Sequence, residues 1–208
     1  MVQGNGTRTA LIVHGYNLNH SDWNEVMWGE IERGLLGRVP MSMLVCHRRR
    51  PDLIIWNTGA SERDGVREAD YIYAWALNNV NKMPSQFVEF KNIDVQALAN
   101  HVRRVSVTEV ESTRTREALL HAIPHLTNGG TLLYDEVIQV TSKNHAGRVL
   151  RDSIALWWEE KGLMIPTAVY AAHTGYAGGT ASEVTIVELT PEKRSAYDAE
   201  RNANTQRS

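Results

Sequence analysis

Short apolar runs alternate along the chain with stretches of helical periodicity. Residues 9–13 (TALIV) are rich in β-branched side chains and are followed by Gly15, which is typical of a buried strand that ends in a tight turn. Residues 51–56 (PDLIIW) repeat this pattern and break at Asn57. Three further runs have the same character, at residues 105–110, 136–140 and 167–171. Together these runs predict the strands of a largely buried sheet.

Helical periodicity fills the intervals between these strands. After the first strand, Asp22 and Glu25 form a capping box. The apolar residues that then recur at helical spacing are Trp23, Met27, Ile31 and Leu35. We expect these side chains to pack in the core and not to form a cofactor site, because an apolar stripe beside a sheet is ordinarily packing surface. Later helices are predicted along Val66, Ala69, Tyr73, Leu77 and Val80, then at residues 115–125 and 147–161.

The alternation of strands and helices predicts an α/β fold with a mostly parallel sheet and right-handed crossovers. Residues 182–189 (SEVTIVEL) alternate polar and apolar side chains, which favours an edge strand near the C-terminus. Few large apolar residues follow Pro191. We therefore expect one domain over residues 1–190 and a polar tail over residues 191–208.

Charge and composition narrow the class of protein. The 208 residues include 22 Lys and Arg against 24 Asp and Glu, a formal net charge of -2, so we expect no nucleic acid polymer as a partner. No run approaches the roughly 18 apolar residues of a membrane span, and residues 1–9 lack the apolar core of a signal peptide. The single cysteine, Cys46, follows an apolar run and indicates a reducing compartment. These features predict a cytoplasmic protein without a membrane partner, and the oligomeric state stays open.

The segments that follow the strands are unusually polar. In an open parallel sheet these segments form the ligand site. They are residues 14–17 (HGYN), 57–61 (NTGAS), 111–115 (ESTRT), 141–145 (TSKNH) and 173–176 (HTGY). Glycines let the backbone approach a ligand closely, and hydroxyls at a helix start add donors where the helix dipole favours an anion. We expect one polar pocket that binds a small molecule with a phosphate or carboxylate group.

A set of small and polar residues is expected to line this pocket. They are Gly15, Thr58, Gly59, Glu111, Ser112, Thr115, Thr141, His145 and Arg148. The same segments add His14, Asn17, Asn57 and Ser142 as ligand contacts. Taken singly, each hydroxyl has a structural alternative, such as a helix cap for Ser112 or a strand end for Thr141. It is the convergence of the segments that favours a site.

Two titratable residues of this set are candidates for proton transfer. Glu111 and His145 each follow a predicted strand, where a carboxylate or an imidazole can act as a general acid or base. Arg148 follows His145 by three residues and so shares its face of a helix. Its guanidinium can hold a phosphate or carboxylate at two points, unless it pairs with a structural carboxylate such as Glu111 or Asp152.

Three runs of the sequence carry a family resemblance. Residues 51–70 (PDLIIWNTGASERDGVREAD) form a strand, a Ser/Gly-rich turn and an acidic helix in which Glu68 precedes an alanine. Residues 111–118 (ESTRTREA) follow a pattern of Glu, Ser or Thr, any residue, Thr, any residue, Glu. Residues 140–148 (VTSKNHAGR) follow a pattern of Thr-Ser, then His, then Arg. In order and spacing these runs resemble the bacterial YdcF, SanA and ElyC group, often described as domains of unknown function.

This resemblance implies a Rossmann-like three-layer sandwich and a nucleotide-like ligand, with S-adenosylmethionine as the suggested candidate and no agreed reaction. It adds Glu68 to the expected ligand contacts. The chain departs from the group at Asn57-Thr58-Gly59, where Ser-Gly-Gly is usual, and at Ala118, where Asn is common. Residues 82–104 look like an insertion. The membrane anchor of some relatives has no counterpart before residue 9, so we expect an unanchored member.

Other classes of protein fit less well. Residues 11–17 (LIVHGYN) are similar to the His-Gly turn of α/β-hydrolases, but no Gly-x-Ser-x-Gly element occurs, and no glycine-rich dinucleotide fingerprint follows the first strand. His121 and His125 have the spacing of helical metal ligands, but Pro124 interrupts the turn, so no metal is predicted. Two classes remain open. One is an enzyme for group transfer or hydrolysis, and the other is a non-catalytic module that senses the same ligand.

Overall fold

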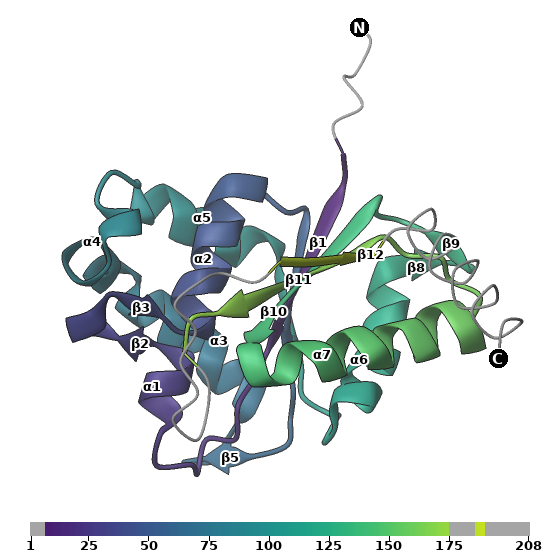
Figure 1. Cartoon of the computed structure of the whole chain (residues 1–208), viewed down its shortest axis with the longest axis horizontal. Coiled ribbons are helices and arrows are strands. Elements are labelled where there is room, and N and C mark those ends of the chain that lie inside the picture. Colours follow the sequence, from purple (N-terminus) through teal and green to yellow (C-terminus); the bar gives the residue numbers. More distant parts are fainter. Residues whose placement is uncertain (1–6, 175–185, 190–208) are drawn as a thin grey trace, which may run out of the picture.

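The computed structural model describes residues 7–174 and 186–189. Its central sheet runs in the order β12-β11-β10-β1-β4-β7, with all neighbours parallel except β11 and β12 (Figure 1). The strands are β1 (Thr9–His14), β4 (Leu53–Asn57), β7 (Ser106–Glu109), β10 (Glu136–Ser142), β11 (Thr167–Ala172) and β12 (Ile186–Leu189). The chain leaves β1 toward β4 and β7 on one side and then returns to β10 on the other. This reversal creates a topological switch point between β1 and β10.

Helices cover both faces of the sheet, as Figure 1 shows. One layer contains α2 (Arg38–Arg49), α3 (Glu68–Asn79) and α5 (Val95–Val105). The other contains α6 (Thr115–Leu126), α7 (Lys143–Ser153) and the π-helix η4 (Ile154–Glu160). Successive side chains of each strand point to opposite faces of the sheet. In β4, Ile54 packs against the first helical layer and Ile55 against the second. The expected α/β class and Rossmann-like sandwich are confirmed.

Shorter elements connect these layers. Between β1 and α2 lie α1 (Trp23–Met27), β2 (Gly29–Glu30), η1 (Ile31–Arg33) and β3 (Leu35–Leu36). Around α3 lie β5 (Glu62–Arg63), β6 (Val66–Arg67), η2 (Val80–Lys82), α4 (Met83–Gln86) and η3 (Val88–Phe90). The hairpin β8 (Thr127–Asn128) and β9 (Thr131–Leu132) follows α6.

The predicted helix after the first strand is wrong beyond Met27. There α1 ends, and the hairpin of β2 and β3 follows, so the crossover to β4 is made by α2. Gly29 breaks the helix: its φ is 122°, and a Cβ on it would lie 2.1 Å from the carbonyl oxygen of Leu35. Trp23 and Met27 are buried as expected, whereas Ile31 is 45% exposed and Leu35 is half-buried.

The structure also tests the predicted strands, the start of α3, the segment at residues 82–104 and the position of Cys46. The predicted strands are confirmed, and β12 is an antiparallel edge strand, while residues 182–185 and the tail at 191–208 lie outside the described residues. Val66 is exposed in β6, because α3 begins only at Glu68. The segment at residues 82–104 packs into the first layer through Phe87, Phe90 and Leu98. Cys46 is a buried free thiol in α2.

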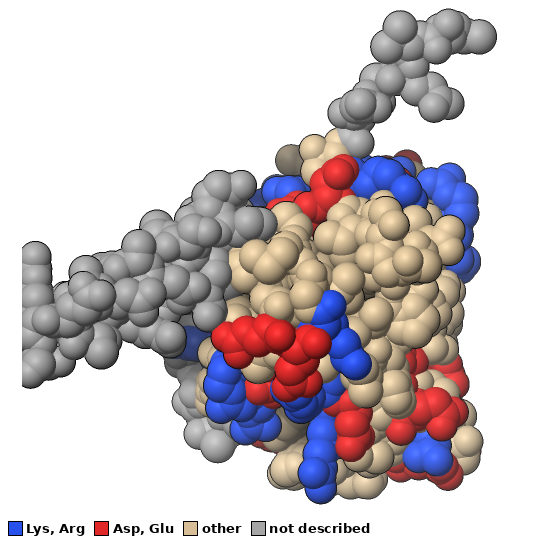
Figure 2. All heavy atoms as spheres, turned by 90° about the vertical axis from the view of Figure 1, so that its right-hand side faces the viewer, with Lys and Arg blue, Asp and Glu red and all other residues tan. Residues whose placement is uncertain are grey.

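The outer surface of the second layer carries charges of both signs. Figure 2 shows this face, with acidic and basic side chains side by side in its lower part and an uncharged area above them. The ion pair between Arg116 of α6 and Glu160 of η4 is an example of this mixing. None of the described helices is long and apolar enough to cross a membrane.

Candidate functional site

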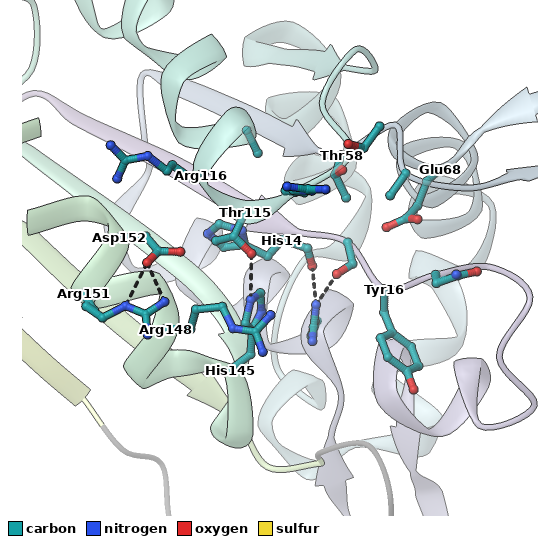
Figure 3. Close-up of a pocket in the computed structure, with 17 residues that line it drawn as sticks. His14, Tyr16, Thr58, Glu68, Thr115, Arg116, His145, Arg148, Arg151 and Asp152 are labelled. Atoms are coloured by element: carbon teal, nitrogen blue, oxygen red, sulfur yellow. Dashed lines mark hydrogen bonds and ion pairs between the residues drawn. The ribbon is translucent and has the colours of Figure 1, made fainter. Parts of the chain in front are cut away.

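A pocket of about 580 Å³ opens at the carboxyl ends of the parallel strands (Figure 3). Its wall is formed by the loops after β1, β4 and β7, by residues at the starts of α2, α3 and α6, and by residues along the length of α7. The lining residues are His14, Gly15, Tyr16, Asn17, Arg38, Thr58, Ala60, Glu68, Thr113, Arg114, Thr115, Arg116, Ala118, His145, Arg148, Arg151 and Asp152. The pocket therefore lies at the switch point, where open α/β sheets bind ligands.

Arg38 joins the ends of β1 and β10. It is the first residue of α2 and is only 1% exposed. Its Nε donates to Ser142 Oγ at 2.7 Å, and its Nη1 donates to the carbonyl oxygens of His14, at 3.1 Å, and Gly15. The guanidinium carbon lies 5.6 Å from the centre of the Tyr16 ring. The side chain thus holds the switch point together and places a buried positive charge in the pocket wall.

His14, the last residue of β1, has a defined tautomer. Ser153 Oγ donates to the carbonyl of Val149 and therefore accepts from Gln139 Nε2, at 2.8 Å. Gln139 Oε1, at 2.9 Å from His14 Nε2, must then accept, so the imidazole proton is on Nε2. Burial lowers the pKa of His14 to about 4, against a partly opposing effect of the bond to Gln139. The ring is neutral at pH 7.

His145 is held from both sides by threonine hydroxyls. Its Nδ1 lies 2.9 Å from Thr141 Oγ1 and its Nε2 lies 3.0 Å from Thr115 Oγ1. Burial, with the neighbouring His14 adding to it, lowers the pKa of His145 to about 2. The neutral ring therefore donates to one hydroxyl and accepts from the other. This arrangement ties the start of α6 to the end of β10 and leaves no ring nitrogen for a substrate.

Glu68 is the least satisfied side chain of the pocket wall. It is the first residue of α3 and is 1% exposed. Its Oε2 accepts from Ser61 Oγ, whereas its Oε1 is buried with no hydrogen-bond partner among the described residues. Burial raises the pKa of Glu68 to about 7, although the bond from Ser61 and the charge of Arg38 act against this rise. A Cβ on Gly15 would lie 2.2 Å from Glu68 Oε1, so only glycine leaves room for the carboxyl group.

Asn57 ends β4 with a buried amide that also lacks a partner among the described residues. It is in register with His14 of β1 on one side and Glu109 of β7 on the other. Because Ile55 packs against α6 and η4, strand alternation places Asn57 on that same face. The polar row formed by these three residues lies across the carboxyl edge of the sheet.

The loops after β4 and β7 are fastened to each other through Ser112. Its carbonyl accepts from the Gly59 N–H and from Thr58 Oγ1, each at 2.9 Å. Its own N–H donates to Glu109 Oε1 at 2.9 Å. Burial raises the pKa of Glu109, but hydrogen bonds from Ser112 and His121 outweigh this effect and the net shift is downward. Glu109 is thus a charged anchor for the loop.

The pocket is rich in cations although the whole chain is slightly acidic. Among the described residues, its lining contains five arginines against two carboxyl groups, Glu68 and Asp152. Arg151 pairs with Asp152, whereas Arg148 has no ion pair among the described residues. Neither the N-cap residue of α6 nor that of α7 caps its helix with a side-chain hydrogen bond. The N–H groups at these helix starts add to the positive potential of the arginines.

The structure brings many of the predicted residues to this pocket. Those in the lining are His14, Gly15, Asn17, Thr58, Glu68, Thr115, His145 and Arg148. Buried beside the lining, but not part of it, are Asn57, Gly59, Ser112, Thr141 and Ser142. Gly59, Ser112 and Thr141 were expected in the lining but lie behind it. Ser112 is hydrogen-bonded to Glu109 and Thr141 to His145. Gly59 packs closely on the next loop, where a Cβ on it would lie 1.7 Å from the Val110 carbonyl oxygen.

The expectation for Glu111 needs correction. Its side chain is exposed and does not line the pocket, and only its backbone N–H bonds to Glu109, at 2.8 Å. Since β7 ends at Glu109, the carboxylate that faces α6 is that of Glu109 and not that of Glu111. The suggested pairing of Arg148 with Glu111 or Asp152 is not seen either, because Asp152 bonds to Arg151.

Arg38 and Tyr16 were missed by reasoning from the sequence alone. Tyr16 stands in a segment that was recognised, but no separate signal marks it. Arg38 falls between Leu35, the last residue of the predicted first helix, and the strand predicted from Pro51, an interval for which no element was predicted. One local signal was available, since Pro40 is tolerated only in the first turn of a helix and so marks a helix start close to Arg38.

The comparisons leave the family open. No family model, curated protein or solved structure matches this chain. The resemblance to the YdcF, SanA and ElyC group therefore stays a prediction. Among the described residues there is also no group of three or more His, Cys, Asp or Glu side chains that could hold a metal ion.

Proposed function

We propose that this protein is an enzyme that binds a small, phosphate-bearing, nucleotide-like ligand in the pocket and hydrolyses it or transfers a group to or from it. The observation that carries the proposal is the convergence of five arginines and two helix starts at the switch point of a parallel sheet. Arginine binds phosphate through two parallel hydrogen bonds, and helix starts supply further N–H donors.

Arg148 is the best-placed contact for the phosphate. It is exposed to the pocket and, among the described residues, has no carboxylate partner that a ligand would have to displace. Arg116 and Arg151 already hold carboxylates of Glu160 and Asp152, so their charges are partly offset. A ligand phosphate against Arg148 would restore the neutrality that this end of the pocket lacks.

Glu68 is the proposed proton carrier. Because burial raises its pKa to about 7, both protonation states are populated near neutral pH. A general base takes the proton from an attacking water in hydrolysis, or from an attacking hydroxyl in group transfer. His145 supports the reaction indirectly, since its two hydrogen bonds hold Thr115 and Thr141 in place. It acts as a positioning residue in this scheme.

S-adenosylmethionine is the second candidate ligand. Its carboxylate suits the helix starts, and its ribose and adenine give it the size and shape of a nucleotide. Its sulfonium and ammonium groups give it a net positive charge, which the excess of arginine in the lining disfavours. The phosphate-bearing ligand is therefore preferred, and S-adenosylmethionine enters the test beside it.

A thermal-shift series followed by a product assay tests the proposal. The series contains AMP, ADP, ATP, pyrophosphate and S-adenosylmethionine, and a ligand at about 100 times its Kd adds about 2.7 kcal/mol of stability. We expect the phosphate compounds to stabilise the protein. Chromatography after incubation then separates an enzyme from a sensor, because only an enzyme releases a product. Stabilisation without any product would favour the sensing module, and no response to any phosphate compound would overturn the anion site.

Two glutamine substitutions assign the proton carrier. Glu68→Gln should lower turnover by about 100-fold or more while pyrophosphate still binds. Glu111→Gln is the matched control, because it makes the same chemical change at an exposed residue outside the lining. Loss of turnover in Glu111→Gln and not in Glu68→Gln would reverse the assignment.

A further inference from the structure

The pocket has two chemically different ends (Figure 3). One end carries Arg116 of α6 and Arg151 of α7, and Arg148 of α7 extends from this side to lie beside His145 in the view of Figure 3. The other end carries Tyr16, Thr58 and Glu68, which come from the loops after β1 and β4 and from α3. His14, Thr115 and His145 lie between the two ends. The second end also has a positive charge nearby, because the Arg38 guanidinium lies 5.6 Å from the centre of the Tyr16 ring, but it adds two hydroxyl groups and a buried carboxyl group.

The second end holds an acceptor that has no donor among the described residues. Glu68 Oε1 is buried and has no hydrogen-bond partner among the described residues, although Oε2 accepts from Ser61. Oε1 occupies the room that a side chain on Gly15 would need, since a Cβ there would lie 2.2 Å from it. Buried polar atoms in folded proteins are almost always hydrogen-bonded, to protein or to something bound. The partner of Oε1 is thus a donor that the described residues do not supply.

A neighbouring amide adds donors at the same strand edge. Asn17 follows β1 and lines the pocket, and its Oδ1 accepts from the Asn19 N–H at 2.9 Å. The bond fixes which side of the amide faces the backbone, and none of the described residues accepts from its Nδ2. An acceptor and a donor that face one pocket suit hydroxyl groups, because each hydroxyl both donates and accepts.

We propose that the substrate is a phosphate ester of a ribose or another sugar, and that a sugar hydroxyl donates a hydrogen bond to Glu68 Oε1. This inference rests on the proposed function, because it needs the phosphate to occupy the arginine end. A pocket of about 580 Å³ has the size of a site for a small ligand such as a mononucleotide. The sugar then lies between the phosphate and the wall of α3.

Ligands that differ by single hydroxyls test this arrangement. Isothermal titration is carried out with AMP, 2′-deoxy-AMP, 3′-deoxy-AMP, ribose 5-phosphate and 2-deoxyribose 5-phosphate. Pyrophosphate, which has no sugar, reports on the arginine end alone. We expect at least one deoxy compound to bind about tenfold or more weakly than its parent, as is usual when a hydrogen bond to a charged group is lost.

Two variants assign the effect to its residue. Glu68→Gln should bring the affinities of parent and deoxy compounds to within about twofold of each other and leave the pyrophosphate affinity unchanged. Asp152→Asn is the matched control, because it removes a carboxylate from the other end of the same pocket. It should keep the discrimination between parent and deoxy compounds. If Glu68→Gln does not fold, the ligand series on the unmodified protein still decides the question.

The outcomes separate this inference from the function on which it rests. Equal binding of parent and deoxy compounds, with pyrophosphate bound, would overturn the sugar inference alone. Discrimination that persists in Glu68→Gln would also overturn it, since another residue would then read the hydroxyl. Failure of every phosphate compound to bind, pyrophosphate included, would overturn the proposed function as well.

Discussion

Two walls of the pocket differ in how completely the protein satisfies their polar groups. The β1–β10 wall consists of His14, Arg38 and His145, and each of these side chains is hydrogen-bonded within the chain. The β4–α3 wall is formed by Glu68, whose buried Oε1 has no partner among the described residues, and the Asn57 amide, which also lacks one, is buried behind the lining. Both walls lie at the same pocket.

This difference in hydrogen bonding distinguishes a structural role for one wall from ligand contact for the other. A buried polar group with its partners in place makes a rigid scaffold, whereas an unpartnered one destabilises the fold by about 1 to 3 kcal/mol. A folded protein retains an unpartnered buried group of this kind where a bound molecule supplies the missing hydrogen bond. We therefore assign scaffolding to the β1–β10 wall and ligand contact to the β4–α3 wall. Substitutions should affect stability at the first wall and recognition at the second.

The largest expected effect is at Arg38. Arg38→Ala removes one guanidinium and leaves Ser142 Oγ and the carbonyls of His14 and Gly15 without this donor. We expect the free energy of unfolding in urea to fall by about 3 to 4 kcal/mol. Arg148→Ala is the control, because that side chain is exposed, and it should change stability by about 0.5 kcal/mol at most. A loss below about 1 kcal/mol for Arg38→Ala would remove the distinction between the walls.

The second prediction concerns stability against pH at Glu68. Burial raises its pKa from an ordinary 4.5 to about 7, so between these values the folded state binds more protons than the unfolded state. The stabilisation is complete below about pH 4.5 and is lost as the pH rises through about 7. Glu68→Gln should remove this loss, so the variant gains up to about 3 kcal/mol over the wild type by pH 8.

The histidines of the other wall act in the opposite direction. Burial lowers the pKa of His14 to about 4 and that of His145 to about 2, so both destabilise the fold as the pH falls below 6.5. Wild type and Glu68→Gln both contain these histidines, so the histidine effect cancels when the unfolding free energy of one is subtracted from that of the other at each pH. A difference that stays constant from pH 4 to pH 8 would show that Glu68 does not titrate as its burial predicts.

The third prediction tests whether His145 positions or catalyses. If it only holds two hydroxyls, Thr141→Val and His145→Asn should both raise KM by about tenfold and change kcat little, because each loosens the same contact. A general base would behave otherwise. Its loss would lower kcat by about 100-fold or more in His145→Asn alone and would remove a limb of the pH–rate profile.

The sequence predicted the sheet and a polar pocket at its carboxyl edge because both depend on local patterns. The apolar run of β1 and the polar residues after it are contiguous, and parallel strands bring their carboxyl ends to one edge. It did not predict Arg38, because the start of α2 depends on the packing of the hairpin β2 and β3 at Gly29. The prediction named Glu111 instead of Glu109, because the carboxylate that faces α6 is determined by strand pairing, which the local sequence does not reveal. The burial of Glu68 likewise depends on a contact with Gly15, a distant residue.

The smallest expected effect is at Arg148, which tests the arginine end without touching either wall. Lysine keeps the charge but not the planar pair of donors, so Arg148→Lys should weaken pyrophosphate binding by about three- to tenfold, or about 1 kcal/mol. The melting temperature of the empty protein should stay unchanged, because no described residue pairs with Arg148. Arg151→Lys is the comparison, since Arg151 already holds Asp152 and should matter less for the anion. Titration and thermal unfolding of both variants decide the matter. If pyrophosphate affinity falls equally in Arg148→Lys and Arg151→Lys, the anion is held by the summed charge of the arginine end and not by one guanidinium. If the affinity falls in neither variant, the phosphate lies against Arg38 and the helix starts.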